Sequence, residues 1–134
     1  MSPTISCDSV YKIFGANANK LLADSNGSVD AKQFQDAGCI VGVNNASFDV
    51  EKGEMLVVMG LSGSGKSTLL RCISRLTDAT AGKILVDGED ICLMNNKQLV
   101  ELRREKMGMV FQNFALLPHK TVIENIAFPL QVKG

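Results

Sequence analysis

The sequence lacks an excess of charge of either sign. Over 134 residues, 14 lysine and arginine residues balance 14 aspartate and glutamate residues. Strong attraction to nucleic acid or anionic lipid needs a cationic surface, so this balance disfavours a nucleic-acid-binding role. The length suits one domain with a hydrophobic core of its own.

Long apolar runs are missing as well. No stretch approaches the roughly 18 to 20 apolar residues that span a bilayer, and Met1–Asp8 lacks the basic and apolar regions of a signal peptide. We therefore expect the chain to stay in the cytosol. Paired cysteines are also absent, which favours reduced, buried thiols over disulfides or a zinc site. The four cysteines are Cys7, Cys39, Cys72 and Cys92.

What the sequence does contain is a glycine-rich stretch, Gly60–Thr68, with the letters GLSGSGKST. It follows Met55–Met59, which is apolar throughout and therefore typical of a central parallel strand. It precedes Leu69–Leu76, where the apolar residues have helical spacing. The stretch thus lies at the junction between an expected strand and an expected helix.

This stretch matches the phosphate-binding P-loop pattern G-x-x-x-x-G-K-[ST]. Glycines let successive N–H groups point inward without a Cβ to block phosphate oxygens, and the following helix start adds partial positive charge. We expect Lys66 to reach the β- and γ-phosphates of a nucleotide and the Ser67 hydroxyl to bind Mg²⁺. A chance match in a flexible loop is the alternative, which the flanking patterns disfavour. The predicted binding residues are Gly60, Ser62, Gly63, Ser64, Gly65, Lys66, Ser67 and Thr68.

Further strands are expected on both sides of this loop. Val10–Phe14 and Ile40–Val50 have the residue types of strands. Lys83–Gly88 predicts a strand that ends in an Asp-Gly hairpin turn. Met107–Phe111 predicts another apolar strand.

Capping residues mark the expected helices. The polar segment 16–38 is expected to hold one short helix, capped by Ser28, running through Phe34 and terminated by Gly38. A polar helix is expected from Asn95 or Asn96 to about residue 106. Residues 121–124, Thr-Val-Ile-Glu, match the capping box that starts a helix.

A carboxylate suited to ATP hydrolysis is not evident. Ile84–Asp87 is the only apolar run that ends in an acid, but Gly88 makes Asp87 typical of a turn, so a role on Mg²⁺ is disfavoured. A guanine-reading Asn/Thr-Lys-x-Asp motif is also missing, because the nearest stretch, Asn96–Leu99, lacks the acid. Its absence favours adenine over guanine.

Together, Gly60–Thr68, Gly82–Gly88, Met109–His119 and Thr121–Asn125 resemble the first half of an ABC-transporter ATPase subunit. Residues 112–119 are similar to that family's Q-loop. The resemblance implies an α/β fold, the P-loop NTPase core of ABC ATPase type with an antiparallel β portion, incomplete at the C-terminus. It implies one domain over residues 1–134, from P-loop through Q-loop, with an inserted segment at about 16–38.

The same resemblance implies roles for single residues. Gln112 would approach Mg²⁺ and the attacking water, which makes it the predicted catalytic residue and a metal-site residue beside Ser67. Phe14 would stack on adenine, with Tyr11 as the second candidate, although core packing is the alternative for an aromatic at a strand end. His119 is interpreted as a surface residue.

More narrowly, Tyr11–Gly15, Gly38–Asn44 and Met59–Gly65 resemble the ATPases of glycine betaine/proline (quaternary amine) importers. The implied function is ATP binding, with Mg²⁺, in a transporter that takes up glycine betaine, proline or a related osmolyte. Implied partners are a second ATPase subunit, transmembrane permease subunits and, indirectly, a substrate-binding protein. The implied location is the inner face of the plasma membrane, through the permease.

The sequence departs from the family after the Q-loop. No segment resembles the LSGGQ signature, the strand with the catalytic glutamate or the switch histidine. We therefore expect an N-terminal fragment that binds ATP without hydrolysing it efficiently. The alternatives are a non-catalytic nucleotide-binding or interaction module and, less favoured, a small kinase.

Overall fold

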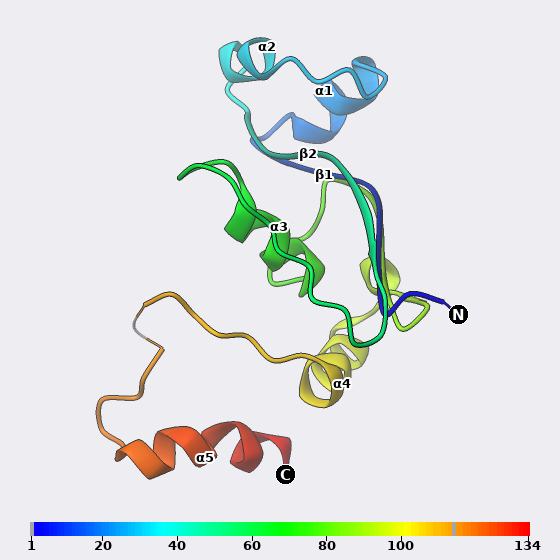
Figure 1. Cartoon of the computed structure of the whole chain (residues 1–134). Coiled ribbons are helices and arrows are strands. Elements are labelled where there is room, and N and C mark those ends of the chain that lie inside the picture. Colours follow the sequence, from blue (N-terminus) through cyan, green and yellow to red (C-terminus); the bar gives the residue numbers. More distant parts are fainter. Residues whose placement is uncertain (1, 114) are drawn as a thin grey trace. The chain divides into compact units, whose positions relative to one another are not determined.

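The antiparallel sheet is the main element of the first part of the chain. The computed structural model describes residues 2–113 and 115–134, in two compact units, Met1–Met94 and Asn95–Gly134. In the first unit β1 (Ile5–Phe14) lies between β2 (Ile40–Val50) and β3 (Ala81–Val86) (Figure 1). A short strand, β4 (Glu89–Asp90), pairs with β3, and every strand pair described is antiparallel. The predicted antiparallel β portion is confirmed.

Apolar side chains of β1 and β3 contribute to the core of this unit. Val10 of β1 and Ile84 of β3 are fully buried. β3 ends in the predicted Asp-Gly turn, where Asp87 and Gly88 have φ values of 48° and 82°. Two consecutive positive φ values are typical of the hairpin turn that best fits the twist of paired strands. The hairpin prediction is therefore confirmed.

The inserted segment forms two helices rather than the one expected. They are α1 (Ala18–Asp24) and α2 (Ala31–Asp36). The cap of α2 is Asp30, not Ser28, because the Asp30 carboxylate accepts hydrogen bonds from two backbone N–H groups of the first turn. The N-cap residue of α1, Asn17, makes no side-chain capping bond, so no local cap stabilises the start of this helix.

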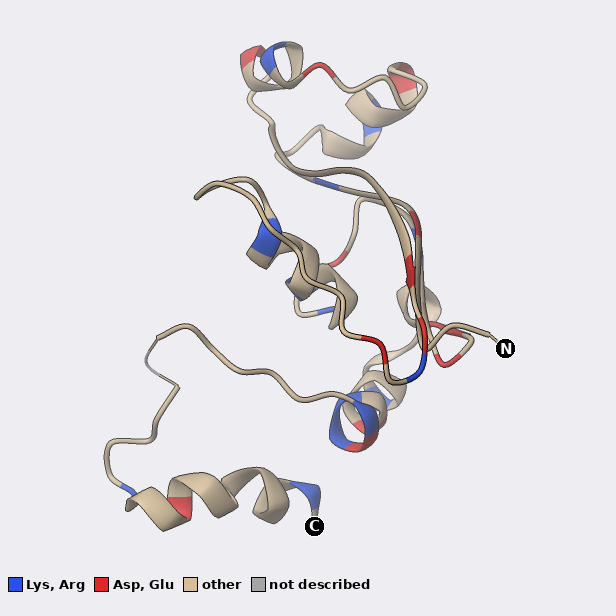
Figure 2. Cartoon of the chain, in the orientation of Figure 1, with Lys and Arg blue, Asp and Glu red and all other residues tan. Residues whose placement is uncertain are grey.

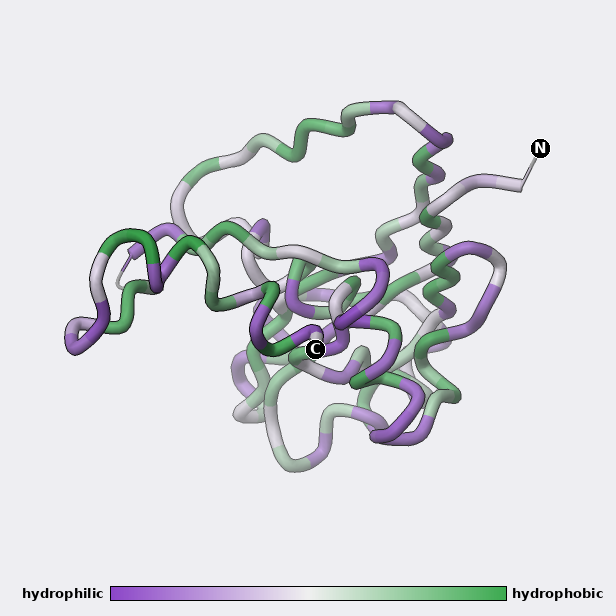
Figure 3. The backbone as a smooth tube through the Cα atoms, turned by 90° about the horizontal axis from the view of Figure 1, so that it is seen from below, coloured by the Kyte–Doolittle hydropathy of each residue, from purple (hydrophilic) through white to green (hydrophobic). Residues whose placement is uncertain are grey.

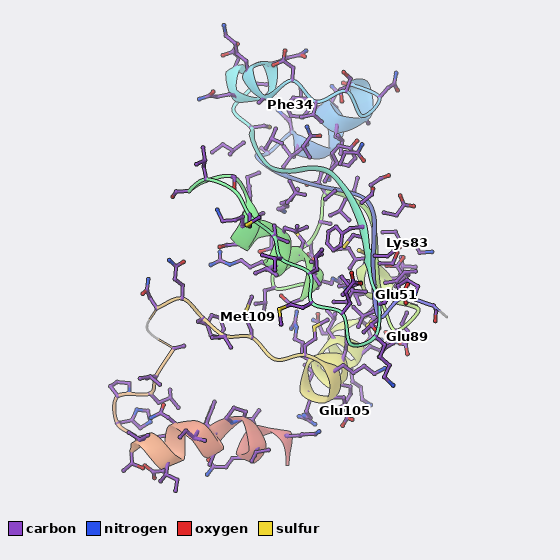
Figure 4. All side chains as sticks on the ribbon, viewed as in Figure 1. Phe34, Glu51, Lys83, Glu89, Glu105 and Met109 are labelled. Atoms are coloured by element: carbon purple, nitrogen blue, oxygen red, sulfur yellow. The ribbon has the colours of Figure 1, made fainter. Side chains whose placement is uncertain are left out.

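A small core joins this insertion to the strands that carry it. Phe34 of α2 is fully buried, and it belongs to a cluster with residues of β1 and α1 (Figure 4). The cluster consists of Tyr11, Ile13, Ala18, Leu22, Phe34 and Cys39. The insertion is therefore packed on the end of the β1–β2 hairpin.

Helix α3 (Lys66–Ile73) follows the glycine-rich loop and packs on β1 and β2. Its end is tied to the 3-10 helix η1 (Ile91–Leu93) by Arg75, whose guanidinium donates to the carbonyl oxygens of Ile91 and Met94. Arg75 also pairs with Asp78 at 2.9 Å. The predicted helix after the loop is confirmed.

Two predicted strands are wrong. Met55–Met59 and Met107–Phe111 are not paired in any sheet of the described residues, and the side chains of Met55 and Met59 are 86% exposed. An isolated extended segment leaves its N–H and C=O groups without ladder partners, so an apolar sequence alone does not make a strand. The pattern that indicated central parallel strands was therefore insufficient.

The second unit holds α4 (Asn96–Lys106) and α5 (Val122–Lys133). Both predicted caps are confirmed: Asn95 forms a capping box with Gln98, and Thr121 forms one with Glu124. Charges of both signs lie along α4 (Figure 2). α5 has no buried residue, and its apolar residues can be followed as green segments in the hydropathy trace of Figure 3.

The cysteines are free thiols, as predicted. Cys7, Cys39 and Cys72 are buried and Cys92 is half-buried. Burial raises the pKa of Cys7 to about 11, which keeps the thiol protonated and unreactive near neutral pH. Within the described residues, no helix is both long and apolar enough to cross a bilayer.

Candidate functional site

The P-loop, residues 60–68, is seated directly on strand β2. Gly65 is the N-cap of α3 and has a φ of 96°, a left-handed conformation that glycine adopts without strain. A Cβ on Gly65 would also collide with the carbonyl oxygen of Gly42 in β2. Glycine is therefore required at position 65 both by the backbone conformation and by the close approach of the sheet.

Lys66 closes the loop from the inside. Its Nζ donates to the carbonyl oxygens of Gly60 and Leu61, both at 2.7 Å, and to Oγ of Ser64 at 3.3 Å. These three acceptors match the three N–H bonds of the ammonium group. The tip, Ser62 and Gly63, is exposed. The ammonium group of Lys66 thus lies inside a curled loop, and the tip of that loop is accessible.

The start of α3 supplies donors at the same place. The first helical hydrogen bond runs from the N–H of Leu69 to the carbonyl oxygen of Gly65 at 2.9 Å. The N–H groups of Lys66, Ser67 and Thr68 come before it, and the first N–H groups of a helix have no acceptor inside the helix. No side chain caps α3. These donors, the helix dipole and the Lys66 charge together suit a phosphate chain.

The two aromatic candidates for adenine stacking differ in burial. Tyr11 is 9% exposed, lies in the core cluster with Phe34, and donates its hydroxyl to the carbonyl oxygen of Gly27 at 3.3 Å. Phe14 is 43% exposed and lies at the end of β1. Tyr11 therefore has a structural role, whereas one side of Phe14 is accessible to a ligand.

Phe14 also lies next to the P-loop helix. A Cβ built on Gly42 would lie 2.9 Å from Cε2 of Phe14 and 3.0 Å from Cγ2 of Thr68. The ring and the first turn of α3 therefore meet at the side-chain position of one residue of β2. The structure brings the predicted base-stacking and phosphate-binding residues together within the first unit.

Gln112 lies in the second unit, in an exposed bend. The role assigned to it on Mg²⁺ and water stays a prediction. The residue two positions further on, Phe114 of the Q-loop-like segment, lies outside the described residues. His119 is exposed, as the interpretation as a surface residue requires.

Asp87 lies at the other end of β1 from Phe14. Its N–H donates to the carbonyl oxygen of Thr4, just before β1 begins, and Val86 pairs with Ile5. A strand rises about 3.3 Å per residue, so the length of β1 puts Asp87 on the order of 30 Å from the Phe14 end. The turn position of Asp87 agrees with its exclusion from the nucleotide site.

Sequence reasoning missed two residues of this site, Lys12 and Gly42. Nζ of Lys12 lies 4.9 Å from the centre of the Phe14 ring, a cation–π distance. The positive charge of Lys12 also partly opposes the burial that raises the pKa of Cys72 in α3. The available signal was Gly42 itself, since glycine inside a strand pattern indicates a bulge or a close backbone approach.

A P-loop at the N-terminus of a helix, set beside a sheet, is typical of the P-loop nucleotide-binding proteins. The sequence profile of the family described as ABC transporter matches residues 43–133. The chain belongs to this family.

Relatives and solved structures agree with this assignment. The chain is 79% identical over 132 residues to the trimethylamine N-oxide transport system ATP-binding protein TmoW of Pelagibacter ubique. It is 42% identical over 135 residues to the glycine betaine/proline betaine transport system ATP-binding protein ProV of Escherichia coli. The fold matches the dimeric, ADP- and Pi-bound structure of the ATP-binding cassette MJ0796 with a TM-score of 0.75 and 30% identity.

These matches cover nearly all of this chain but less than half of each protein compared. The TmoW match covers 98% of this chain and 39% of that protein, and the ProV match covers 100% and 34%. The MJ0796 match covers 97% and 48%. The shared part includes the P-loop, since the family profile spans it.

Proposed function

We propose that this chain is the ATP-binding part of an ABC ATPase that powers uptake of a small osmolyte. The observation that carries the proposal is the seating of the P-loop: Gly65 lies against the backbone of β2, and Lys66 is held over the loop at the start of α3. This geometry collects N–H donors and one cation at a single accessible point. A nucleotide triphosphate has the matching charge.

In this proposal the N–H groups of the loop bind the β- and γ-phosphates, and Lys66 exchanges its hydrogen bonds to the loop for bonds to phosphate oxygens. The exposed hydroxyl of Ser67 would bind Mg²⁺, which neutralises charge on the phosphate oxygens when bound. For Gln112, a role on Mg²⁺ and the attacking water is proposed from the resemblance alone. The Ser67 hydroxyl suits this ion, because Mg²⁺ prefers oxygen ligands. Its exposed position leaves room for the several waters that Mg²⁺ keeps.

The adenine base would stack on Phe14. The ring is partly exposed and lies beside Thr68, whereas Tyr11 is committed to the core. A base on Phe14 and phosphates on residues 60–68 would place one nucleotide along a single edge of the first unit.

The transported substrate and the partners are proposed from the relatives. Their names indicate transport of trimethylamine N-oxide and of glycine betaine or proline betaine, which are small N-methylated compounds. We propose the same substrate class here. The MJ0796 cassette is dimeric, which supports a second ATPase subunit as a partner. Permease subunits would hold the protein at the inner face of the plasma membrane, with a substrate-binding protein acting on the outer side.

Calorimetric titration with MgATP tests nucleotide binding. Lys66→Ala removes a charge-assisted contact worth about 1.5–3 kcal/mol, so we expect affinity to fall about ten- to a hundredfold. Lys83→Ala is the control, because Lys83 is exposed on β3 and lies outside the P-loop. Equal affinity of wild type and Lys66→Ala would exclude the proposed site.

A phosphate-release assay tests whether this chain alone can hydrolyse the ATP that it binds. We expect this chain alone to bind MgATP with phosphate release near background, because no carboxylate has been identified to activate water and binding alone does not lower the barrier. Activity abolished by Lys66→Ala and by Asp87→Asn would show that Asp87 had been excluded wrongly. Uptake of labelled trimethylamine N-oxide and glycine betaine by cells with the complete transporter tests the substrate class.

A further inference from the structure

Strand β2 carries an extra residue where it passes the P-loop. The neighbouring β1 residues Lys12 and Ile13 pair with Val43 and Val41, so the register shifts and Gly42 has no partner of its own. This is the pattern of a β-bulge. Bulges bend a strand and redirect neighbouring groups, and they are frequent beside functional sites.

Three parts of the nucleotide site converge on this bulged residue. On its side-chain side, the Phe14 ring and the methyl group of Thr68 occupy the space that a Cβ would need. Gly65 lies so close to the carbonyl oxygen of Gly42 that a Cβ on Gly65 would collide with that oxygen. Gly42 therefore touches the base-stacking ring, the first turn of α3 and the last glycine of the loop.

The Phe14 ring is also held from a second direction. Lys12 lies two residues earlier on the same face of β1, and its ammonium group lies over the ring at 4.9 Å from the centre. The ring nevertheless remains 43% exposed. Contacts with Lys12 and Gly42 thus fix the ring while leaving part of it open.

We propose that Gly42 is a positioning residue that sets the distance between the base-stacking ring and the phosphate-binding loop. The inference rests on the proposed function, because it assumes that Phe14 and the P-loop bind the same nucleotide. Any side chain at position 42 must displace the ring or the Thr68 methyl group. The ring is the far end of a side chain, whereas the Thr68 methyl group is attached close to the backbone of α3. The ring therefore moves more easily. A Cβ at position 42 therefore misplaces the base while the phosphate site persists.

Gly42→Ala, titrated with two ligands, tests this directly. One ligand is MgATP, and the other is magnesium tripolyphosphate, which has the phosphates without the base. Because stacking on an aromatic ring is worth a factor of about five to about a hundred, we expect ATP affinity to fall within that range. Tripolyphosphate affinity should stay within about twofold. Gly108→Ala is the matched control, since Gly108 has no positive φ and no neighbour within 4 Å of an added Cβ.

A double variant keeps the test decisive if Gly42→Ala folds poorly. In Phe14→Ala the ring atom that meets the new Cβ is gone, so Phe14→Ala/Gly42→Ala should bind ATP as Phe14→Ala does. A further loss in the double variant would overturn the proposal. Equal losses for ATP and tripolyphosphate in Gly42→Ala, or no loss for either, would also overturn it.

The wild type separates failure of this inference from failure of the proposed function. If wild type binds both ligands and Gly42→Ala shows no split between them, only the positioning role is wrong. If wild type binds neither ligand, the nucleotide site itself is wrong, and the positioning role with it.

Discussion

The P-loop region and helix α5 are specified in different ways. Around the P-loop, the decisive contacts join residues far apart in the chain, such as Gly42 with Gly65. In α5, the decisive contacts are local: the Thr121–Glu124 capping box and the Asn125 side chain, which bonds backbone groups of residues 117, 120 and 121. α5 has no buried residue. Local contacts form a helix without a core, whereas the nucleotide site depends on the sheet.

The largest expected difference in the free energy of unfolding is between alanine substitutions of two phenylalanines, one from each region. Phe34 is fully buried and Phe128 of α5 is 41% exposed. Phe34→Ala should lower the free energy of unfolding by about 3–5 kcal/mol, because it leaves a cavity, and Phe128→Ala by about 0.5 kcal/mol. Urea unfolding followed by fluorescence of Tyr11, the only tyrosine and a neighbour of Phe34 in the core, measures the first. Circular dichroism measures the second.

Similar losses of unfolding free energy in Phe34→Ala and Phe128→Ala would contradict the proposed difference between the regions. A large cost for Phe128→Ala would mean that α5 buries its apolar side.

A second test compares two glycines that both have positive φ. Gly53 has φ 82° with no neighbour within 4 Å of an added Cβ, whereas Gly65 has φ 96° and lies against Gly42. Gly53→Ala should cost about 1–2 kcal/mol of stability for the left-handed conformation alone. Gly65→Ala should cost a further 1–3 kcal/mol, on the order expected for overpacking, and should abolish MgATP binding. Equal costs in urea unfolding would contradict the close seating of the loop on β2.

The capping box of α5 gives a smaller effect. Oγ1 of Thr121 accepts a hydrogen bond from the N–H of Glu124 at 3.3 Å. Thr121→Ala should destabilise the helix by about 1 kcal/mol, whereas Thr121→Ser should retain the cap. Amide hydrogen exchange in α5 should therefore accelerate in the alanine variant only. Acceleration in the strands of the first unit as well would contradict a purely local effect of the cap.

The smallest effect is a pH dependence of the same cap. The backbone N–H of Thr121, at 2.7 Å, and then its hydroxyl hold the pKa of Glu124 below its ordinary value of 4.5. The carboxylate is thus favoured in the folded helix, so its contribution is present above pH 4.5 and is lost as pH falls through the lowered pKa. A ¹³C NMR titration of the carboxyl should show the lowered midpoint. Glu124→Gln should remove the corresponding pH dependence of α5 amide exchange.

Features that depend on local contacts could be predicted from the sequence, whereas those that depend on distant residues could not. The caps at Asn95 and Thr121 and the Asp87 turn depend on neighbouring residues, and they were predicted correctly. The strand at Met55–Met59 was predicted wrongly because pairing depends on distant segments. The P-loop was recognised from its own residues. Its seating on β2 depends on a register shift that a glycine inside the strand pattern indicates, but the glycine alone does not say which segment approaches it.

The inserted segment contains both predictable and unpredictable features. Gly38 has a positive φ just after the end of α2, as its predicted terminating role requires. The helix α1 and the burial of Phe34 depend instead on packing against β1, so they were not predicted. Local chemistry marked the end of the helix, and tertiary packing determined the rest.

An NMR titration of isotope-labelled protein with MgATP would locate the nucleotide on the chain. The largest amide shifts should fall on residues 60–68 and Gly42, with shifts of the Phe14 ring signals. The turn at Asp87 and Gly88 and the helix α5 should change little. Shifts that are absent from residues 60–68, or that are largest at Asp87, would contradict a nucleotide site built from the P-loop and Phe14.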